Sequence, residues 1–335
     1  DSTRPSALKS LAEQLARALK HVGGEPTETA VAESQHRFGR GRATAPPPLR
    51  LPRGRRLVFG NRTHVMAKLG LSPGTETGAA ATSLEQVRQQ VRKMATAGIR
   101  LVALEEEIAP GRMPDGGLSA TGPALAAPWL PVLEALRAEG DLVIAAPAAT
   151  AGTARAALAA GADLLLTSGP VREASALAEV AAEAGVPLVV RYNPGDRSEG
   201  GEVLSNLLRF FTETLESLER TGVAPEQVVL DTGESWAANP ADTLEIIWRL
   251  GELQTLGRPL LLSLPSGQAL AQIPALAAAP ESQHLAPVVT AVIAAVRGAQ
   301  LIQVAPVTSA TAVAAALRLA DVLVRGWEGE LAAGC

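Results

Sequence analysis

The feature that most constrains the fold is an alternation of short apolar runs with helix-like segments along most of the chain. The runs are continuously apolar rather than alternating, as expected of strands that are buried on both faces of a parallel sheet. The segments between them have helical periodicity, and one of them ends at Gly222, where a C-terminal cap is expected. The eight runs are residues 56–61, 100–106, 142–147, 163–168, 187–192, 227–233, 259–265 and 301–306.

Eight strand signals, each followed by a helix signal, over about 270 residues predict an α/β protein with a closed (β/α)8 TIM barrel. A doubly wound open sheet is the alternative, although it normally uses fewer strands. Apolar residues make up 47% of the chain but aromatic residues only 3%. The core must therefore be built from Ala, Val and Leu, which suits a helix-rich α/β protein.

The first 55 residues differ from the rest and predict an N-terminal helical extension before a barrel over residues 56–330. Leu8, Leu11, Leu15 and Leu19 lie on one side of an expected amphipathic helix. The Arg- and Pro-rich stretch that follows is expected to form a linker without helix or strand, because Gly and Pro interrupt it. A basic arm that binds an acidic partner is the alternative reading of its arginines.

Composition and motifs exclude several classes of function. The formal net charge of −4 argues against a protein that binds nucleic acid or a membrane surface. The only cysteine is Cys335, so a cysteine metal cluster is excluded, and without HExxH or paired histidines no metal site is expected. No glycine-rich phosphate loop opens a helix after a strand, and no cofactor is expected. The chain has no signal-peptide pattern and no long apolar span, which makes a cytoplasmic protein the default expectation.

In a barrel of this kind the chemistry lies where the C-terminal ends of the strands meet, so polar residues at strand ends are the candidates. Glu106 lies within three successive glutamates, whose repulsion can raise a pKa, and His64 is the only histidine near an expected strand end. Both are candidate proton-transfer groups. The alternative interpretations are that Glu106 is solvated or paired with an arginine, and that His64 is a loop histidine without a catalytic role. Arg191 and Trp236 are candidates for a wall that stacks on a flat ligand.

Asp231 ends the sixth expected strand within the tripeptide Asp-Thr-Gly, which in aspartic proteases carries the catalytic carboxylate. Those enzymes need two carboxylates that share a proton in an all-β fold, so the protease interpretation fails for this α/β chain. Asp231 is left as a carboxylate that either reads a ligand or anchors its strand.

The amino-acid sequences of several segments resemble those of the dihydropteroate synthase family, whose enzymes are pterin-binding (β/α)8 barrels. The similar segments include GTARAALAAGADLLLTSG, LERTGVAPEQVVLDTG and RLVFGNRT, and the likeness runs over almost all of residues 56–325. The resemblance implies that Asp231 reads the aminopyrimidine edge of a pterin. It also implies that Asn61 lies near a diphosphate and its metal, at the end of the opening strand.

At other positions the chain departs from that family. The family's Ser-Arg-Lys motif is replaced by 265–267, its Arg-x-His by 303–305, and the lysine of its Gly-Phe-Gly-Lys by Ala238. The polar motifs of the third and fourth strands become 146–148 and 166–167. Because expelling a diphosphate requires fixed cations around the leaving group, joining a hydroxymethylpterin diphosphate to p-aminobenzoate is not expected.

The sequence thus predicts a repurposed barrel that binds or transforms a flat heterocycle or another non-diphosphate small molecule. A non-catalytic paralogue acting as an assembly or regulatory subunit is one alternative, and an authentic dihydropteroate synthase-type transferase is another. Relatives that hold methyltetrahydrofolate for a corrinoid protein fit less well, because the polar residues of the third and fourth strands are lost. A pterin-like ligand is the expected partner, and a homodimer or a partner protein is left open.

Overall fold

A computed structural model describes the chain from residue 45 to residue 325, with internal gaps. The described residues are 45–60, 62–71, 84–106, 129–168, 175–192, 202–233, 240–264, 285–305 and 307–325. The chain divides into two compact units, Asp1–Ala45 and Pro46–Cys335, so the second unit begins ten residues before the expected boundary at residue 56. The expected N-terminal helix lies outside the described residues.

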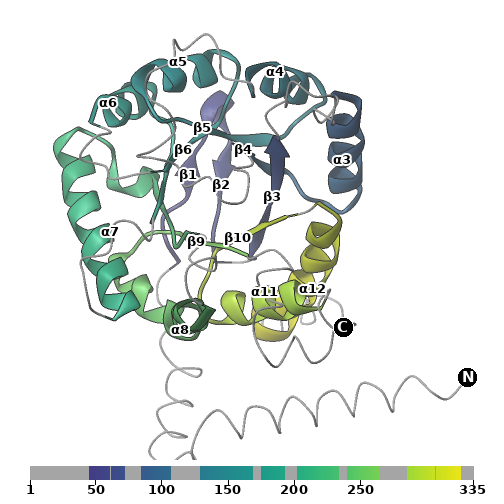
Figure 1. Cartoon of the computed structure of the whole chain (residues 1–335), viewed down its shortest axis with the longest axis vertical. Coiled ribbons are helices and arrows are strands. Elements are labelled where there is room, and N and C mark those ends of the chain that lie inside the picture. Colours follow the sequence, from purple (N-terminus) through teal and green to yellow (C-terminus); the bar gives the residue numbers. More distant parts are fainter. Residues whose placement is uncertain are drawn as a thin grey trace, which may run out of the picture. The chain divides into compact units, whose positions relative to one another are not determined.

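The second unit is a closed barrel of eight parallel strands in the order β10-β3-β4-β5-β6-β7-β8-β9, which confirms the predicted TIM barrel (Figure 1). Its strands are β3 (His64–Leu71), β4 (Leu101–Glu106), β5 (Val143–Pro147), β6 (Leu164–Ser168), β7 (Leu188–Arg191), β8 (Val228–Asp231), β9 (Leu260–Ser263) and β10 (Leu301–Val304). Seven of the eight expected runs contain these strands, from β4 to β10.

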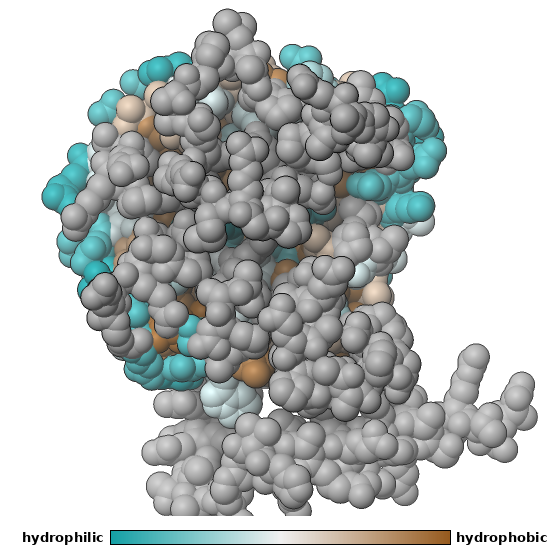
Figure 2. Space-filling model, viewed as in Figure 1, coloured by the Kyte–Doolittle hydropathy of each residue, from teal (hydrophilic) through white to brown (hydrophobic). Residues whose placement is uncertain are grey.

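Helices surround the barrel, and hydrophilic residues on the outward faces of several of them appear as teal along the left and right edges of Figure 2. The α-helices are α3 (Leu84–Thr96), α4 (Leu130–Ala138), α5 (Ala151–Ala159), α6 (Ser175–Ala184), α7 (Val203–Arg220), α8 (Pro240–Arg249), α11 (Ala286–Val296) and α12 (Val307–Arg325). Short 3-10 helices are η1 (Pro52–Gly54), η5 (Pro225–Gln227) and η7 (Leu250–Leu256). Among the described residues, no helix is both long and apolar enough to cross a membrane.

The prediction of the opening strand was wrong. Residues 56–60 do not join the barrel; the first barrel strand is β3, which pairs with β10 on one side and β4 on the other. Lys68 and Gly70 interrupt the apolar character of β3, so it does not stand out as a buried strand in the sequence. The alignment of RLVFGNRT with the family's opening strand fails for the same reason.

The Arg- and Pro-rich linker was also expected to lack strands, and here too the structure differs. β1 (Leu49–Arg50) and β2 (Arg56–Leu57) form a two-stranded antiparallel hairpin. Arg53 and Gly54 make its turn in the left-handed region, at φ values of 61° and 70°. The hairpin therefore uses the Pro and Gly residues of this segment in its turn rather than within its strands.

The hairpin closes the end of the barrel at which the strands begin, and Figure 1 shows it inside the outline of the ring. Leu49, Leu51, Leu57 and Phe59 are at most 6% exposed and pack with the apolar side chains of the barrel interior. Asp163, fully buried just before β6, accepts hydrogen bonds from Arg53 and Arg55 of the hairpin.

Successive side chains of each strand point alternately into two cores, because neighbouring side chains in a strand point to opposite faces. Residues such as Val102 and Leu104 of β4 face the surrounding helices, where they join the larger core. Leu101 and Ala103 of the same strand face the barrel interior and join the smaller core with the hairpin. The next inward residue of β4 is Glu105, and there the interior becomes polar.

Candidate functional site

A polar layer closes the apolar interior of the barrel at the C-terminal ends of the strands, which we call the mouth. It contains six inward side chains that continue the alternation of the strands, and we call them the mouth cluster. The mouth cluster is Lys68 (β3), Glu105 (β4), Arg191 (β7), Asp231 (β8), Ser263 (β9) and Gln303 (β10). Six of the eight strands thus contribute to one site at the end of the barrel where chemistry is expected.

Arg191 is the centre of the mouth cluster, because its guanidinium contacts three other members. Its Nε donates to Oδ2 of Asp231 at 2.6 Å, and its Nη2 donates to Oε1 of Glu105 at 2.5 Å. The same Nη2 donates to Oε1 of Gln303 at 3.0 Å. One planar cation therefore bridges two carboxylates, as the fork of donors on an arginine allows.

Asp231 is fully buried, and both its carboxylate oxygens accept hydrogen bonds. Oδ1 accepts from the backbone N–H of Gly233 at 3.0 Å and from Oγ of Ser263 at 3.1 Å, while Oδ2 accepts from Arg191. The Asp-Thr-Gly tripeptide thus folds back on its own carboxylate. A ligand reaches Asp231 only if one of these donors moves.

Glu105 is more accessible and pairs with both cations of the mouth cluster. Nζ of Lys68 lies 2.7 Å from its Oε2, and the side chains of Lys68, Arg191 and Glu105 are 19%, 19% and 10% exposed. Gln303 also donates to Glu105 through its amide nitrogen, and its Oε1 lies 2.6 Å from Oγ of Ser263. Lys68, Arg191 and Glu105 are thus more exposed than Asp231, whose side chain is fully buried.

The two carboxyl groups have pKa values that are displaced in opposite directions. Burial alone would raise the pKa of Glu105, but the charges of Arg191 and Lys68 outweigh it and lower this pKa from the usual 4.5 to about 2. Burial raises the pKa of Asp231 above its ordinary value, because Arg191 opposes it less effectively there. Paired carboxyls whose pKa values are driven apart are typical of sites that separate an ionised group from a proton carrier.

The structure brings two of the predicted site residues together and separates another from them. Arg191 and Asp231 both lie in the mouth cluster and contact each other. His64 begins β3 at the opposite end of the barrel, where its Nε2 lies 2.8 Å from the carbonyl oxygen of Val58 and its ring packs edge-on against Phe59. The placement of His64 at the mouth was therefore wrong, and the mistaken opening strand is the cause.

The remaining predicted residues are described only in part. Asn61 and Trp236 lie outside the described residues. Glu106 is the last residue of β4, but its side chain is likewise outside the description, and the glutamate of this strand that joins the mouth cluster is Glu105. Tyr192, the residue after Arg191, packs against Phe210 of α7, with ring centroids 5.3 Å apart.

Sequence reasoning did not single out Lys68, and it chose Glu106 over Glu105. Side chains alternate along a strand, so Glu105 shares a face with Leu101 and Ala103 and lies opposite Val102 and Leu104 of the helix layer. This alternation would have favoured Glu105. Lys68 could be recognised as a candidate site residue only if the opening strand had been assigned to β3. Among the described residues, no group of three or more His, Cys, Asp or Glu side chains is arranged to hold a metal ion.

Comparison with known proteins identifies the family. The family model described as "Pterin binding enzyme" matches residues 72–305, which is more than half of the chain. The chain belongs to the pterin-binding enzyme family. This confirms the resemblance to dihydropteroate synthases that the sequence showed.

Similar members of the pterin-binding enzyme family support the same assignment. The dihydropteroate synthase of Synechocystis sp. is 31% identical over 226 residues, which cover 65% of this chain and 76% of the relative. That of Escherichia coli is 28% identical over 181 residues, covering 52% and 63%.

Solved structures of the pterin-binding enzyme family share the fold. Xanthomonas albilineans dihydropteroate synthase with 4-aminobenzoic acid has a TM-score of 0.69 at 26% identity, covering 84% of this chain and 99% of that chain. Yersinia pestis DHPS with a pterine-sulfa conjugate has a TM-score of 0.68 at 25% identity, covering 82% and 98%.

Proposed function

We propose that the mouth cluster binds a flat heterocycle with a pterin-like aminopyrimidine edge, and that this barrel does not catalyse an ordinary displacement of diphosphate. The observation that carries the proposal is the bridge from Glu105 through Arg191 to Asp231. The two carboxylates already hold a guanidinium, and an aminopyrimidine edge presents N–H donors in a similar planar arrangement. A pterin-like edge is therefore a chemical match for the partner that these carboxylates hold in the free protein.

The charge balance of the mouth cluster argues against diphosphate chemistry. Among the described residues of the cluster, the two cations Lys68 and Arg191 are both paired with carboxylates. A leaving diphosphate needs several cationic groups that are free to neutralise its developing charge. One such donor stabilises the transition state by about 3 kcal/mol. With its cations paired to carboxylates, the mouth cluster is better suited to binding a polar heterocycle than a diphosphate.

A matched pair of ligands tests the proposal. Calorimetric titration with a pterin and with lumazine, which has a carbonyl in place of the exocyclic amino group, should show binding of the pterin alone. Asp231→Asn should weaken pterin binding by about tenfold, as expected for loss of a charge-assisted hydrogen bond. Arg155→Ala, at an exposed position of α5 that is not part of the mouth cluster, is the matched control and should leave the affinity unchanged. Equal binding of pterin and lumazine, or equal affinity in both variants, contradicts the proposal.

The dihydropteroate synthase reaction itself is a second candidate, because the relatives named above carry that name and one solved relative is bound to 4-aminobenzoic acid. Incubation with a hydroxymethyldihydropterin diphosphate and p-aminobenzoate, followed by chromatography of dihydropteroate, decides between the two. We expect pterin binding without appreciable turnover. Turnover in the ordinary enzyme range, about 1 per second or faster, would establish the second candidate instead.

We further propose that two copies of the chain associate through α8 and α11. Leu285, which precedes α11, and Val289, Ile293 and Val296 within it follow one another three or four residues apart and are 39–42% exposed. Trp248 of α8 is 59% exposed. Such a run of exposed apolar side chains is typical of a protein interface. Light scattering should show a dimer that Ile293→Glu converts to a monomer, whereas a monomeric wild type contradicts the proposal.

A further inference from the structure

The end of the barrel opposite the mouth carries two adjoining cavities of about 440 and 420 Å³. Both lie where strands begin, because Arg100, Glu226 and Arg258 precede β4, β8 and β9 and line their walls. Arg56 of the hairpin lines both cavities. Their size is that of sites for small molecules, and the apolar interior of the barrel separates them from the mouth cluster.

These cavities are strongly basic. Their walls contain six arginines and two carboxylates; the arginines are Arg50, Arg55, Arg56, Arg62, Arg100 and Arg258. Arg55 is paired with Asp141 and Asp163. Within the part of the chain that the structure describes, the other five arginines have no ion-pair partner. This contrasts with the mouth cluster, where both cations are paired, and with the net charge of −4 of the whole chain.

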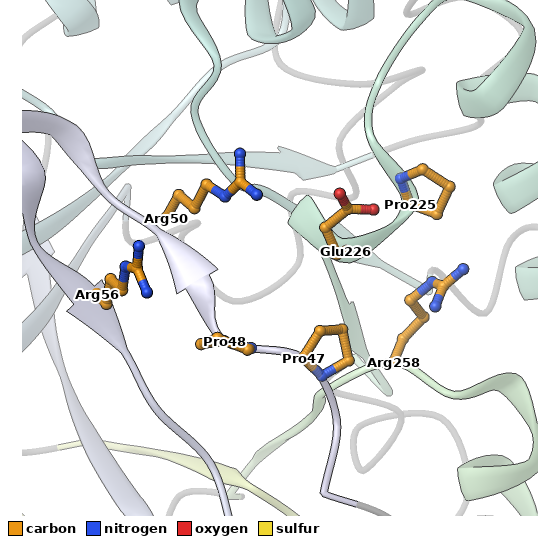
Figure 3. Close-up of a pocket in the computed structure, with 7 residues that line it drawn as sticks. All are labelled: Pro47, Pro48, Arg50, Arg56, Pro225, Glu226 and Arg258. Atoms are coloured by element: carbon orange, nitrogen blue, oxygen red, sulfur yellow. The ribbon is translucent and has the colours of Figure 1, made fainter.

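The hairpin holds two of these arginines directly opposite each other. Arg50 and Arg56 are register partners in the antiparallel pair, so their side chains share one face. Like charges at such positions repel one another, and an anion between them relieves the repulsion. Figure 3 shows both arginines on one side of the larger cavity, Glu226 and Arg258 on the other, and the segment Pro47–Pro48 between them.

The arginines are held on a fixed framework. The backbone N–H of Arg50 donates to Oε1 of Gln227 at 2.8 Å, and Nε2 of Gln227 donates back to the carbonyl of Arg50 at 2.8 Å. This pair of bonds joins the hairpin to η5, which carries Glu226. Arg50 thus presents its charge from a backbone that is hydrogen-bonded to η5. Across the cavity, Nε of Arg258 is buried without a hydrogen-bond acceptor among the described residues.

We infer that this end of the barrel is a binding site for a small oligophosphate, in which Arg56 contacts the chain of phosphates between the two cavities. Guanidinium groups match phosphate oxygens in charge and geometry. Two adjoining basic cavities that share one arginine fit several linked phosphate groups better than a single anion. The site is independent of the proposed function at the mouth.

Calorimetric titration of the full chain with inorganic triphosphate at low salt tests the inference. We expect saturable binding that Arg56→Ala weakens by about tenfold or more, since a hydrogen bond between charged groups is worth about 1.5–3 kcal/mol. Arg258→Ala and Arg100→Ala, one from each cavity, should weaken binding as well. Arg56 and Arg100 are exposed, so their substitution should leave the fold intact, which circular dichroism can verify.

Two control variants and two control ligands test whether triphosphate binds at this site specifically. Arg155→Ala should bind triphosphate like the wild type, and so should Lys68→Met, which removes a cation from the mouth. Orthophosphate should bind much more weakly than triphosphate, and a single-stranded oligonucleotide should not bind at the triphosphate concentrations used. Unchanged affinity in Arg56→Ala, loss of affinity in Lys68→Met, equal binding of orthophosphate, or binding of the oligonucleotide alone would each overturn the inference.

Discussion

Arg191 and Asp231 are register partners on the adjacent strands β7 and β8, and the Nε of Arg191 donates to Oδ2 of Asp231 at 2.6 Å. The bond joins the ends of two strands inside the barrel. Because Nη2 of Arg191 also donates to Glu105 on β4 and to Gln303 on β10, the guanidinium joins four strands. The proposed ligand site is thus also part of the network of contacts that joins the strands at the mouth.

Removing Arg191 should therefore destabilise the protein strongly. Arg191→Ala leaves the buried carboxyls of Asp231 and Glu105 without their shared cation, and loss of one partner from such a buried pair costs about 3–5 kcal/mol. Urea denaturation followed by circular dichroism measures the free energy of unfolding, with Arg155→Ala expected within about 0.5 kcal/mol of the wild type. Adding Asp231→Asn to Arg191→Ala should recover part of the loss, so strictly additive effects would contradict this account.

Glu105 should make stability depend on pH in the acidic range. Its pKa is lowered from the usual 4.5 in the unfolded chain to about 2 in the folded protein. The folded state therefore releases this proton more readily, and the stabilisation is complete above about pH 4.5 and is lost as pH falls towards about 2. The displacement corresponds to about 3 kcal/mol.

The difference in unfolding free energy between the wild type and Glu105→Gln isolates this effect. Asp231 works in the opposite direction, because burial raises its pKa, but it is present in both proteins and the charge of Glu105 is the smallest contribution to that rise. The difference should grow between about pH 2 and 4.5 and stay constant at higher pH. A difference that is flat across the whole acidic range would show that Glu105 does not retain its ion pairs in solution.

The barrel could be predicted from the sequence because seven of its strands are short, continuously apolar and separated by helical periods. The opening strand could not be predicted in the same way. Lys68 lies inside β3 and is stabilised there by Glu105, a residue 37 positions further along the chain. A tertiary ion pair of this kind leaves no local signal, so a polar residue in a strand is read as evidence against the strand.

The site was predictable only where a residue's strand was assigned correctly. Asp231 and Arg191 end well-predicted strands and were both found. The hairpin arginines were read as part of a linker, because Pro and Gly in the sequence do not reveal that Gln227 binds the backbone of Arg50. Contacts between segments that are distant in the sequence place the hairpin at the end of the barrel where the strands begin, and they bring its arginines there.

The hairpin should contribute to stability through its apolar face. Phe59 is 5% exposed and packs with the barrel interior, whereas its neighbour Val58 is 50% exposed. Phe59→Ala should cost about 3–5 kcal/mol of unfolding free energy, because it leaves a cavity beneath the hairpin. Val58→Ala should change it by no more than about 0.5 kcal/mol. Similar small losses in both variants would mean that the hairpin does not seal the barrel in solution.

Gly233 should be irreplaceable in the Asp-Thr-Gly segment for a steric reason. It adopts a φ of +77°, and a Cβ added there would lie 2.1 Å from the carbonyl oxygen of Tyr192. Gly222 has a similar φ of +84°, but a Cβ there would meet no atom within 4 Å. Gly222→Ala should therefore cost only the left-handed strain, about 1–2 kcal/mol, and Gly233→Ala should cost more than about 3 kcal/mol.

The same substitution should also impair the site, because the N–H of Gly233 donates to Oδ1 of Asp231 at 3.0 Å. Displacing this backbone moves a donor away from the buried carboxylate, so Gly233→Ala should lose pterin affinity while Gly222→Ala retains it. Denaturation and calorimetric titration of the two variants separate the structural effect from the effect on binding. If both variants lost stability equally and bound pterin equally, the close approach of Gly233 to the Tyr192 carbonyl would have no role in shaping the mouth.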